Sequence, residues 1–561
     1  MKPVLLLLLA LSGLLSAACR QTSSSTPSQA EINAIGLKRG SITMCGPATG
    51  PQLGTAAFGT SCPSAVQPDF NLALSLLHSF EYDEAEKVFA RVIAQEPACA
   101  MAYWGVAMSC YHPLWTPPSP AELTKGAKAI ALAQRLPGKS ARETAYIQAL
   151  ATFYQDWERV EHKTRALRFE QAMATVYAEY PQDHEATIFY ALALDAAADP
   201  TDKSFVKQKK AGALLQGLYP GQPNHPGILH YLIHTYDYPE LARLALPAAR
   251  QYASVAPSSA HALHMPSHIF TRLGLWDECI ASNLAATESA RCYAASAGLP
   301  GHWDEELHGL DYLMYAYLQQ GKTQLARAQW HYLDTIRQVS PVNFKVAYAY
   351  AAIPARYVLE NRLWKEAARL PPRPGHLNWE QYPWQAGIIH FARALGQAHL
   401  GQPDSARREV ATLRGLQEAL LQQKDPYKAT QVQIQLLAAE AWTLLAQGKA
   451  EAAEQRMRQA ANLEDRTEKH PVTPGEVLPA RELLADMLLQ LHRPQEALGA
   501  YEANLTRHPN RLNGLRGAAK AAAQSGETVE AARYQQQLRK LATVALNPEA
   551  AVAHLSLYRR P

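Results

Sequence analysis

Apolar residues recur every three to four positions along most of the chain, in blocks of helical length separated by glycine, proline and polar residues. That spacing gives each block one apolar stripe, which is the pattern of an amphipathic α-helix. Past the N-terminus, no stretch alternates β-branched and polar residues in the way a half-buried strand would. We therefore predict an all-α protein.

A longer period links these helices in pairs. The spacing between Ala85, Phe89 and Pro97 is repeated in a segment that begins at Ala497. In such a pair the small alanine lets two helices approach, the aromatic ring fills the gap, and proline ends the second helix. His230 and His264 are 34 residues apart, and so are His234 and His268. A 34-residue period is typical of a solenoid of helix pairs.

The chain divides by composition. We expect a signal peptide at 1–18, a tether and irregular segment at 19–66, a solenoid with a histidine-rich groove at 67–370, and a second helical array at 376–561. The boundary rests on the run of prolines at 371–375, the strongest internal break.

These signatures resemble the tetratricopeptide-repeat family over about 67–558, most clearly at 82–110, 226–282 and 497–531. The resemblance implies a concave groove, lined mainly by the first helix of each pair, that binds peptides or protein segments. It implies no catalytic residue. The stretches 225–237 and 261–270 also resemble a group of exported bacterial repeat proteins, which implies export but supplies no activity.

Histidines gather where three successive first helices are expected, at 226–236, 260–273 and 304–319. The second, fifth and ninth positions of a first helix follow one stripe that faces the groove. Six of these nine positions are histidine in a chain with 20 histidines among 561 residues, so random scatter is a poor explanation. The positions are Gly227, His230, His234, His261, His264, His268, His308, Asp311 and Tyr315.

Histidines four apart lie on one helix face, so two such pairs on adjacent helices can converge on one point. Neutral imidazole is the commonest metal ligand and suits Zn, Cu or Fe. We predict a transition-metal site whose candidate ligands are His230, His234, His261, His264, His268, His308, Asp237 and Asp311. Pro266 lies between two of them and should kink its helix.

Other chemistries fit less well. Neither His-x3-His pair contains the glutamate of a zinc-protease motif, and no nearby serine or cysteine has an orienting partner for a nucleophile. A metal-dependent reaction stays open, with no catalytic residue assigned. The alternative is a non-enzymatic scaffold whose groove binds a peptide, a protein or a small polar ligand, because a single histidine is more often structural.

Charge and cysteines narrow the picture further. The net charge of +4 comes from mixed basic and acidic residues with no sustained basic face, so we do not expect a nucleic-acid partner. Among seven cysteines, Cys45 and Cys62 bracket a loop-rich segment and are the expected disulfide. The other four in the body of the chain are expected to be small buried residues: Cys99, Cys110, Cys279 and Cys292.

The N-terminus has a short basic start, an apolar run of leucines, and small residues before Cys19. This is typical of an export signal, and a cysteine directly after Ala18 resembles a bacterial lipoprotein signal. Ser16 and Ala18 would also suit ordinary cleavage without lipid. We expect a protein of the cell envelope whose contact with the membrane is limited to a lipid anchor on Cys19.

The lipid anchor is testable by metabolic labelling. Wild-type protein should incorporate a fatty-acid analogue and fractionate with membranes, and Cys19→Ala should lose both properties because the acceptor thiol is gone. Unchanged labelling and fractionation of Cys19→Ala would show that Cys19 is not the acceptor.

Overall fold

A computed structural model describes residues 26–47 and 52–543. The expected signal peptide at 1–18 and the lipidation site Cys19 lie outside these residues. Within the described part of the chain, helices dominate and the only strands are β1 (His302–Trp303) and β2 (Val339–Ser340), which pair in parallel. The all-α prediction is confirmed. None of the helices in these residues combines the length and the apolar composition needed to cross a bilayer.

The helices follow one another with short connections. The first group is α1 (Gln29–Ile35), α2 (Gln67–His78), α3 (Tyr82–Gln95), α4 (Ala100–Ser109), α5 (Pro120–Arg135), α6 (Ala141–Tyr154), α7 (His162–Glu179), α8 (His184–Ala196) and α9 (Val206–Leu218). The second group is α10 (Pro226–Thr235), α11 (Ala242–Val255), α12 (Ala260–His264), α13 (Pro266–Leu273), α14 (Trp276–Ser296), α15 (Asp304–Gln319), α16 (Thr323–Thr335), α17 (Phe344–Glu360) and α18 (Trp364–Ala367). The third group is α19 (Pro383–His399), α20 (Pro403–Gln422), α21 (Pro426–Ala446), α22 (Ala450–Asp465), α23 (Ala480–Gln490), α24 (Pro494–Arg507), α25 (Leu512–Ser525) and α26 (Thr528–Thr543). Single 3-10 turns lie at Ser64–Val66, Tyr219–Gly221 and Trp379–Gln381.

Local sequence explains several helix ends. Ser119 and Ser140 each begin a helix with a capping box, in which the serine and a glutamate three residues later satisfy each other's backbone groups. Pro266 divides the expected helix 260–273 into α12 and α13, as predicted. Gly274 ends α13 with φ of 65°, and a Cβ there would lie 2.3 Å from the carbonyl oxygen of Pro509. Glycine is therefore required at this turn.

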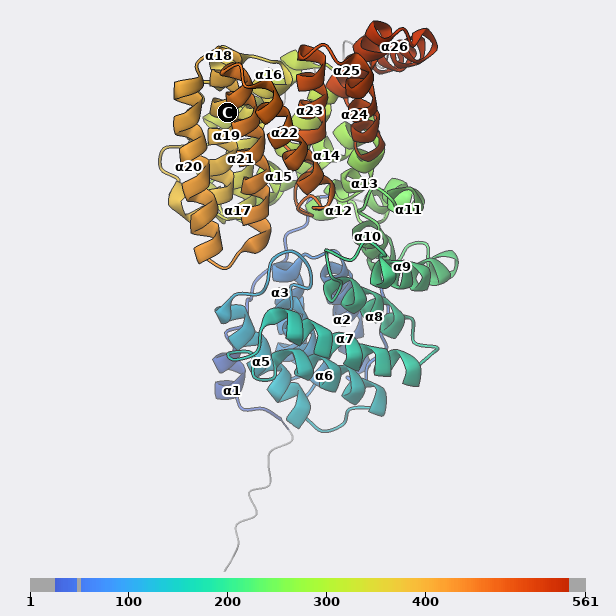
Figure 1. Ribbon diagram of the computed structural model, residues 1–561. Coiled ribbons are helices and arrows are strands. Elements are labelled where there is room, and N and C mark those ends of the chain that lie inside the picture. The colour runs from blue at the N-terminus through green and yellow to red at the C-terminus, as the bar shows by residue number, and fades with distance from the viewer. Residues whose placement is uncertain (1–25, 48–51, 544–561) are drawn as a thin grey trace, which may run out of the picture.

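From α2 onward each helix packs against the next in the chain, which makes the protein a helical-repeat solenoid of tetratricopeptide type. In Figure 1 the helices α1–α8 form one lobe and α12–α26 the other, with α9–α11 between them. The chain does not simply extend, because its last helices return beside the middle of the solenoid. Trp276 Nε1 donates to the carbonyl of Asn510 at 2.9 Å, and the buried guanidinium of Arg511 binds Glu360 at 2.8 Å.

The first lobe also packs against the middle of the solenoid. Helix α10 packs against α2 and α8 as well as against its chain neighbours α9 and α11. This contact joins segments about 150 residues apart, as the 3.0 Å hydrogen-bond distance between His78 Nδ1 and the Tyr231 hydroxyl shows. A histidine of the first helix pair is thereby placed beside the histidine-rich helix.

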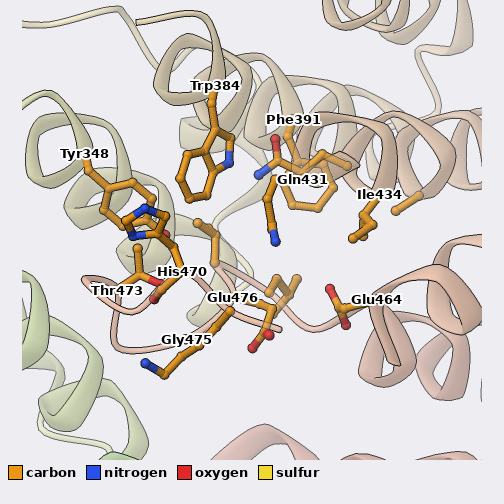
Figure 2. Close-up of a pocket in the computed structure, with 15 residues that line it drawn as sticks. Tyr348, Trp384, Phe391, Gln431, Ile434, Glu464, His470, Thr473, Gly475 and Glu476 are labelled. Carbon is orange, nitrogen blue, oxygen red and sulfur yellow. The ribbon is translucent and has the colours of Figure 1, made fainter. Parts of the chain in front are cut away.

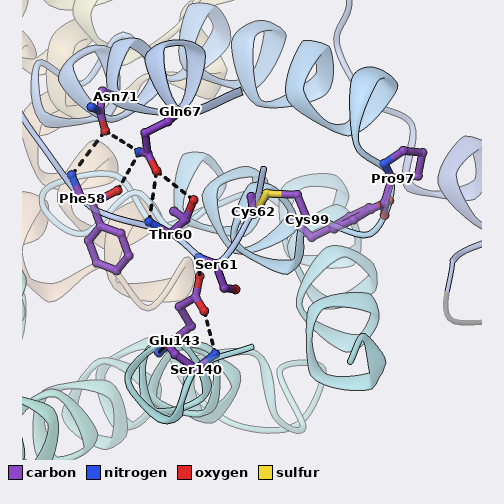
Figure 3. Close-up of a disulfide and its surroundings, with 11 residues drawn as sticks. Phe58, Thr60, Ser61, Cys62, Gln67, Asn71, Pro97, Cys99, Ser140 and Glu143 are labelled. Atoms are coloured by element: carbon purple, nitrogen blue, oxygen red, sulfur yellow. Dashed lines mark hydrogen bonds between the residues drawn. A yellow bond between two sulfur atoms is a disulfide. The ribbon is translucent and has the colours of Figure 1, made fainter. Parts of the chain in front are cut away.

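The disulfide prediction is wrong. Cys45 bonds to Cys292 and Cys62 bonds to Cys99, whereas Cys110 and Cys279 are buried thiols as expected. The reason is that the segment before α2 does not fold on itself but runs across helices of the repeat array. Figure 3 shows the Cys62–Cys99 bond beside the contacts that hold this segment: Ser61 N donates to Glu143 Oε1 at 2.8 Å, and Gln67 Nε2 donates to the Phe58 carbonyl at 2.8 Å.

The boundary at 371–375 stays a prediction. Charged contacts cross it: Lys469 binds Asp237 at 3.0 Å, and Arg511 binds Glu360 at 2.8 Å, with both pairs buried. Separate folding of 376–561 would have to leave these partners unmatched, which is costly for buried charges.

The disulfide pattern can be checked by peptide mapping without reduction. Peptides linking Cys45 to Cys292 and Cys62 to Cys99 are expected, and Cys110 and Cys279 should be alkylated only after unfolding, because both thiols are buried. Replacing Cys62 and Cys99 by serine should lower the free energy of unfolding by about 2–4 kcal/mol. Recovery of a Cys45–Cys62 peptide would contradict the structure.

Candidate metal centre

Six of the predicted ligands form two neighbouring groups in the interior. The first histidine set is His230, His234 and His261, and the second histidine set is His264, His268 and His308. In each set, one nitrogen from every ring lies within 4.8 Å of the others. The side chains come from α10, α12, α13 and α15, which lie within the three first helices expected from the sequence at 226–236, 260–273 and 304–319.

In the first set, three Nε2 atoms converge. His230 Nε2 lies 2.9 Å from His234 Nε2 and 3.1 Å from His261 Nε2. His230 Nδ1 lies 2.6 Å from the carbonyl oxygen of His78, which can only accept, so Nδ1 carries the proton. In the neutral ring, His230 Nε2 is then unprotonated and presents its lone pair to both neighbours.

In the second set, two lone pairs face each other. His264 Nδ1 donates to Asn283 Oδ1 at 2.7 Å, and the amide orientation is fixed because Asn283 Nδ2 donates to the Cys279 carbonyl at 2.8 Å. His268 Nδ1 donates to the carboxylate of Asp237 at 3.1 Å. Both Nε2 atoms are therefore unprotonated in the neutral rings, and they lie 3.1 Å apart.

Two facing lone pairs repel unless a cation lies between them. A tetrahedral ion with metal–nitrogen bonds of about 2.0–2.1 Å separates its ligand nitrogens by about 3.3 Å, close to the nitrogen separations of the two sets. A proton on one of the rings cannot take the place of this cation at neutral pH. Burial lowers the pKa of His230 to about 3 and holds the pKa of His264 well below its usual value. The residues fit a metal ion.

Asp237 orients His268 and does not join either set. Its carboxylate accepts from Arg272 Nε at 2.8 Å and from Lys469 Nζ at 3.0 Å. Burial opposes the charge of Asp237, but Lys469 and Arg272 outweigh it and hold the carboxyl pKa below its usual value. Asp311, the other predicted carboxylate, binds Arg356 at 3.2 Å and lies in no histidine group.

A third group of possible ligands was not foreseen from the sequence. Glu185 lies between His225 Nε2 and His78 Nε2, at 2.9 Å from each. Burial opposes ionisation, yet His78 and His225 hold the pKa of Glu185 below its usual value. Because His78 and Glu185 belong to no 34-residue spacing, only their position in the fold connects them to the site. The two short contacts hold the buried carboxylate of Glu185 in place by hydrogen bonds from both imidazoles.

The histidines are interior and do not line an open groove, since each of the six is less than a tenth exposed. Phe80 covers the first set, with its ring centroid 4.3 Å from that of His230, and Trp115 lies 5.0 Å from His234. Trp115 belongs to the proline-rich loop at 112–118, which separates α4 from α5.

Two cavities reach the first set on either side of this loop. One, of about 450 Å³, is lined by His234, Trp115 and Arg272 among others. The second, of about 420 Å³, includes His261 and Phe80. Figure 2 shows a third cavity, of about 30 Å³, between Trp384, Gln431 and the loop that carries His470 and Glu476. It has room for about one water molecule and lies apart from the histidine sets.

No protein-family profile matches the chain, and no curated protein sequence matches it. Several solved structures share its helical character. They include the human IFIT1 dimer with m7Gppp-AAAA (11% identity, covering 83% of this chain and 95% of that chain, TM-score 0.33) and Naa15/Naa10 bound to HypK-THB (13%, 88% and 75%, 0.22). The APC/C hetero-tetramer Cut9–Hcn1 is similar at 12% identity, covering 89% of this chain and 97% of that chain, with a TM-score of 0.27. Similarity at this level carries no inference about the site.

Acid should destabilise the metal-free protein. The unfolded chain takes up protons on histidine near pH 6.5, whereas His230 in the folded chain does so only near pH 3. Between these values the unfolded state binds more protons, so the free energy of unfolding is intact above pH 6.5 and falls as the pH is lowered. Each such histidine contributes a slope of up to about 1.4 kcal/mol per pH unit.

Denaturant unfolding of metal-free protein from pH 7.5 to 4 measures that slope. His230→Asn should reduce it by up to about 1.4 kcal/mol per pH unit, whereas His331→Asn, exposed on α16, should leave it unchanged. Equal slopes in wild type and His230→Asn would show that His230 is not held neutral.

Proposed function

We propose that this chain is an exported, lipid-anchored helical-repeat protein that binds a transition metal through its two histidine sets. The observation that supports this most is the pair of unprotonated Nε2 atoms of His264 and His268, 3.1 Å apart. The Tyr312 hydroxyl, 3.3 Å from His268 Nε2, can donate to only one of the two rings, so among the described residues His264 Nε2 still faces another lone pair, whereas a shared cation would satisfy both.

The donor chemistry favours Zn, Cu or Fe. All six nitrogens are imidazole, an intermediate donor that suits these ions, and none of the six ligands is a carboxylate of the kind that Mg or Ca prefers. The outer contacts fit as well, because metal-binding histidines usually donate their other N–H to a carboxylate or carbonyl. His268 does so to Asp237 and His230 to the His78 carbonyl.

The alternative of a groove that binds a peptide or protein is less well supported at this place. A peptide laid along the solenoid could not contact histidines that are buried beneath Phe80 and Trp115. A small polar ligand could reach His234 through the cavity of about 450 Å³, which leaves metal-dependent chemistry on such a ligand open. The rest of the helical surface remains available for protein partners.

The proposal predicts near-stoichiometric metal after dialysis against Zn, Cu or Fe, measured by elemental analysis, and a higher melting temperature with metal than without. The double variant His230→Ala, His264→Ala removes an oriented nitrogen from each set and should lose both effects while keeping its helical circular dichroism. His331→Ala is the control and should behave as wild type.

Absence of bound metal in wild type, together with no stabilisation by any of the three ions, would overturn the proposal. Equal metal content in the double variant and wild type would place binding elsewhere on the chain.

A further inference from the structure

The two histidine sets are not separate sites. Helix α12 carries His261 of the first set and His264 of the second, and their ring centroids are 6.5 Å apart. On the other side, His234 and His268 lie 6.1 Å apart. These separations are similar to the largest within a set, such as 6.3 Å between His268 and His308.

Ring distances limit how far apart two ions could lie. An imidazole centroid lies about 3.2 Å from a metal bound at the usual nitrogen distance of about 2.0–2.1 Å. Rings bound to one tetrahedral ion should then have centroids about 5.2 Å apart. The centroids of the first set are 4.7, 5.0 and 6.1 Å apart, and those of the second set are 4.2, 5.0 and 6.3 Å apart. These separations scatter around the expected value, so small ring movements would let each set bind one ion. Rings from different sets are only slightly farther apart than rings of one set. The distance between the two ions would then be near the roughly 3.5–4 Å of known two-metal sites.

Two metal ions bound only by imidazoles would lack negative charge nearby, so the centre needs a further, negatively charged component. The six ligands are neutral imidazoles, so two divalent ions would bring several buried positive charges with no ligand to offset them. Asp237, the carboxylate hydrogen-bonded to a ligand, is already matched by Arg272 and Lys469. Beside His261, Lys345 is shared by Glu305 and Asp304, so this group supplies at most one unmatched negative charge for two ions. Glu81 is hydrogen-bonded to Ser259, and burial raises its pKa to about 8, which keeps it uncharged at neutral pH.

We infer that the two sets form one dinuclear centre and that a small anion with an oxygen or nitrogen donor, such as hydroxide, bridges its two ions. The bridging ligand reaches the centre through the cavity beside His234. This inference rests on the metal binding proposed above and adds to it the number of ions and the class of exogenous ligand.

Copper(II) is the probe that distinguishes one dinuclear centre from two separate ions, because paired and isolated Cu(II) ions differ in electron paramagnetic resonance. Wild type should bind two Cu(II) per chain, and its integrated spin should be well below half of its copper, since a bridging anion couples the two spins. Azide, added as the probe anion, should produce a charge-transfer band that saturates at one azide per two coppers.

Variants confined to one set provide the matched comparison. His234→Ala, His261→Ala should halve the copper content and raise the integrated spin per copper to about one, because the remaining ion has no partner. His268→Ala, His308→Ala should do the same from the other side, and His331→Ala should match wild type.

The copper measurements distinguish failure of the dinuclear centre from failure of the proposed metal binding. Two ions per chain with full spin, or one ion per chain lost only when one particular set is changed, would overturn the dinuclear centre and leave the proposed metal binding intact. No bound copper in wild type would overturn the inference, and failure of Zn and Fe to bind as well would overturn the proposed metal binding. Uncoupled copper that persists in both set variants would show surface binding and contradict the inference.

Discussion

The unprotonated nitrogens of His264 and His268, facing each other at 3.1 Å, are the constraint on which the proposed function depends. Their tautomers follow from neighbours that leave no choice: Asn283 Oδ1 can only accept from His264, and the Asp237 carboxylate can only accept from His268. Burial makes a shared proton expensive. A metal ion bound by both rings would remove the repulsion and would use the orientation that the outer hydrogen bonds already provide.

The rest of the solenoid holds this arrangement rigid. Helix α2 packs on α10 and places the His78 carbonyl where it fixes the His230 ring, while the loop between α22 and α23 brings Lys469 to Asp237. Arg272 binds both the side chain and the backbone carbonyl of Asp237. A nearest-neighbour repeat array alone would not make these contacts, so closure of the chain on itself turns a stripe of histidines into an enclosed centre.

The sequence predicted the parts of the site that repeat and missed the parts that depend on closure. The 34-residue offsets from His230 to His264 and from His234 to His268 placed four histidines on adjacent helices, because equivalent positions in stacked repeats are neighbours. The groove-facing register of the first helices added His261 and His308. These patterns could not show that His78 and Phe80 would meet them, since these residues come from a repeat far away in the chain. The same limit explains Cys45, which bonds to Cys292 across the fold and not to nearby Cys62. Asp311 fits the groove-facing stripe, yet it pairs with Arg356, whose guanidinium also binds the carbonyls of Gly475 and Glu476.

X-ray absorption at the metal edge of the loaded wild-type protein tests the central claim most directly, because it reports the donor atoms around the ion. The structure predicts a nitrogen shell at about 2.0–2.1 Å with the outer-shell scattering of about three imidazole rings per ion. A shell of oxygen donors without imidazole scattering, or a sulfur shell at about 2.3 Å, would contradict a centre built from the two histidine sets.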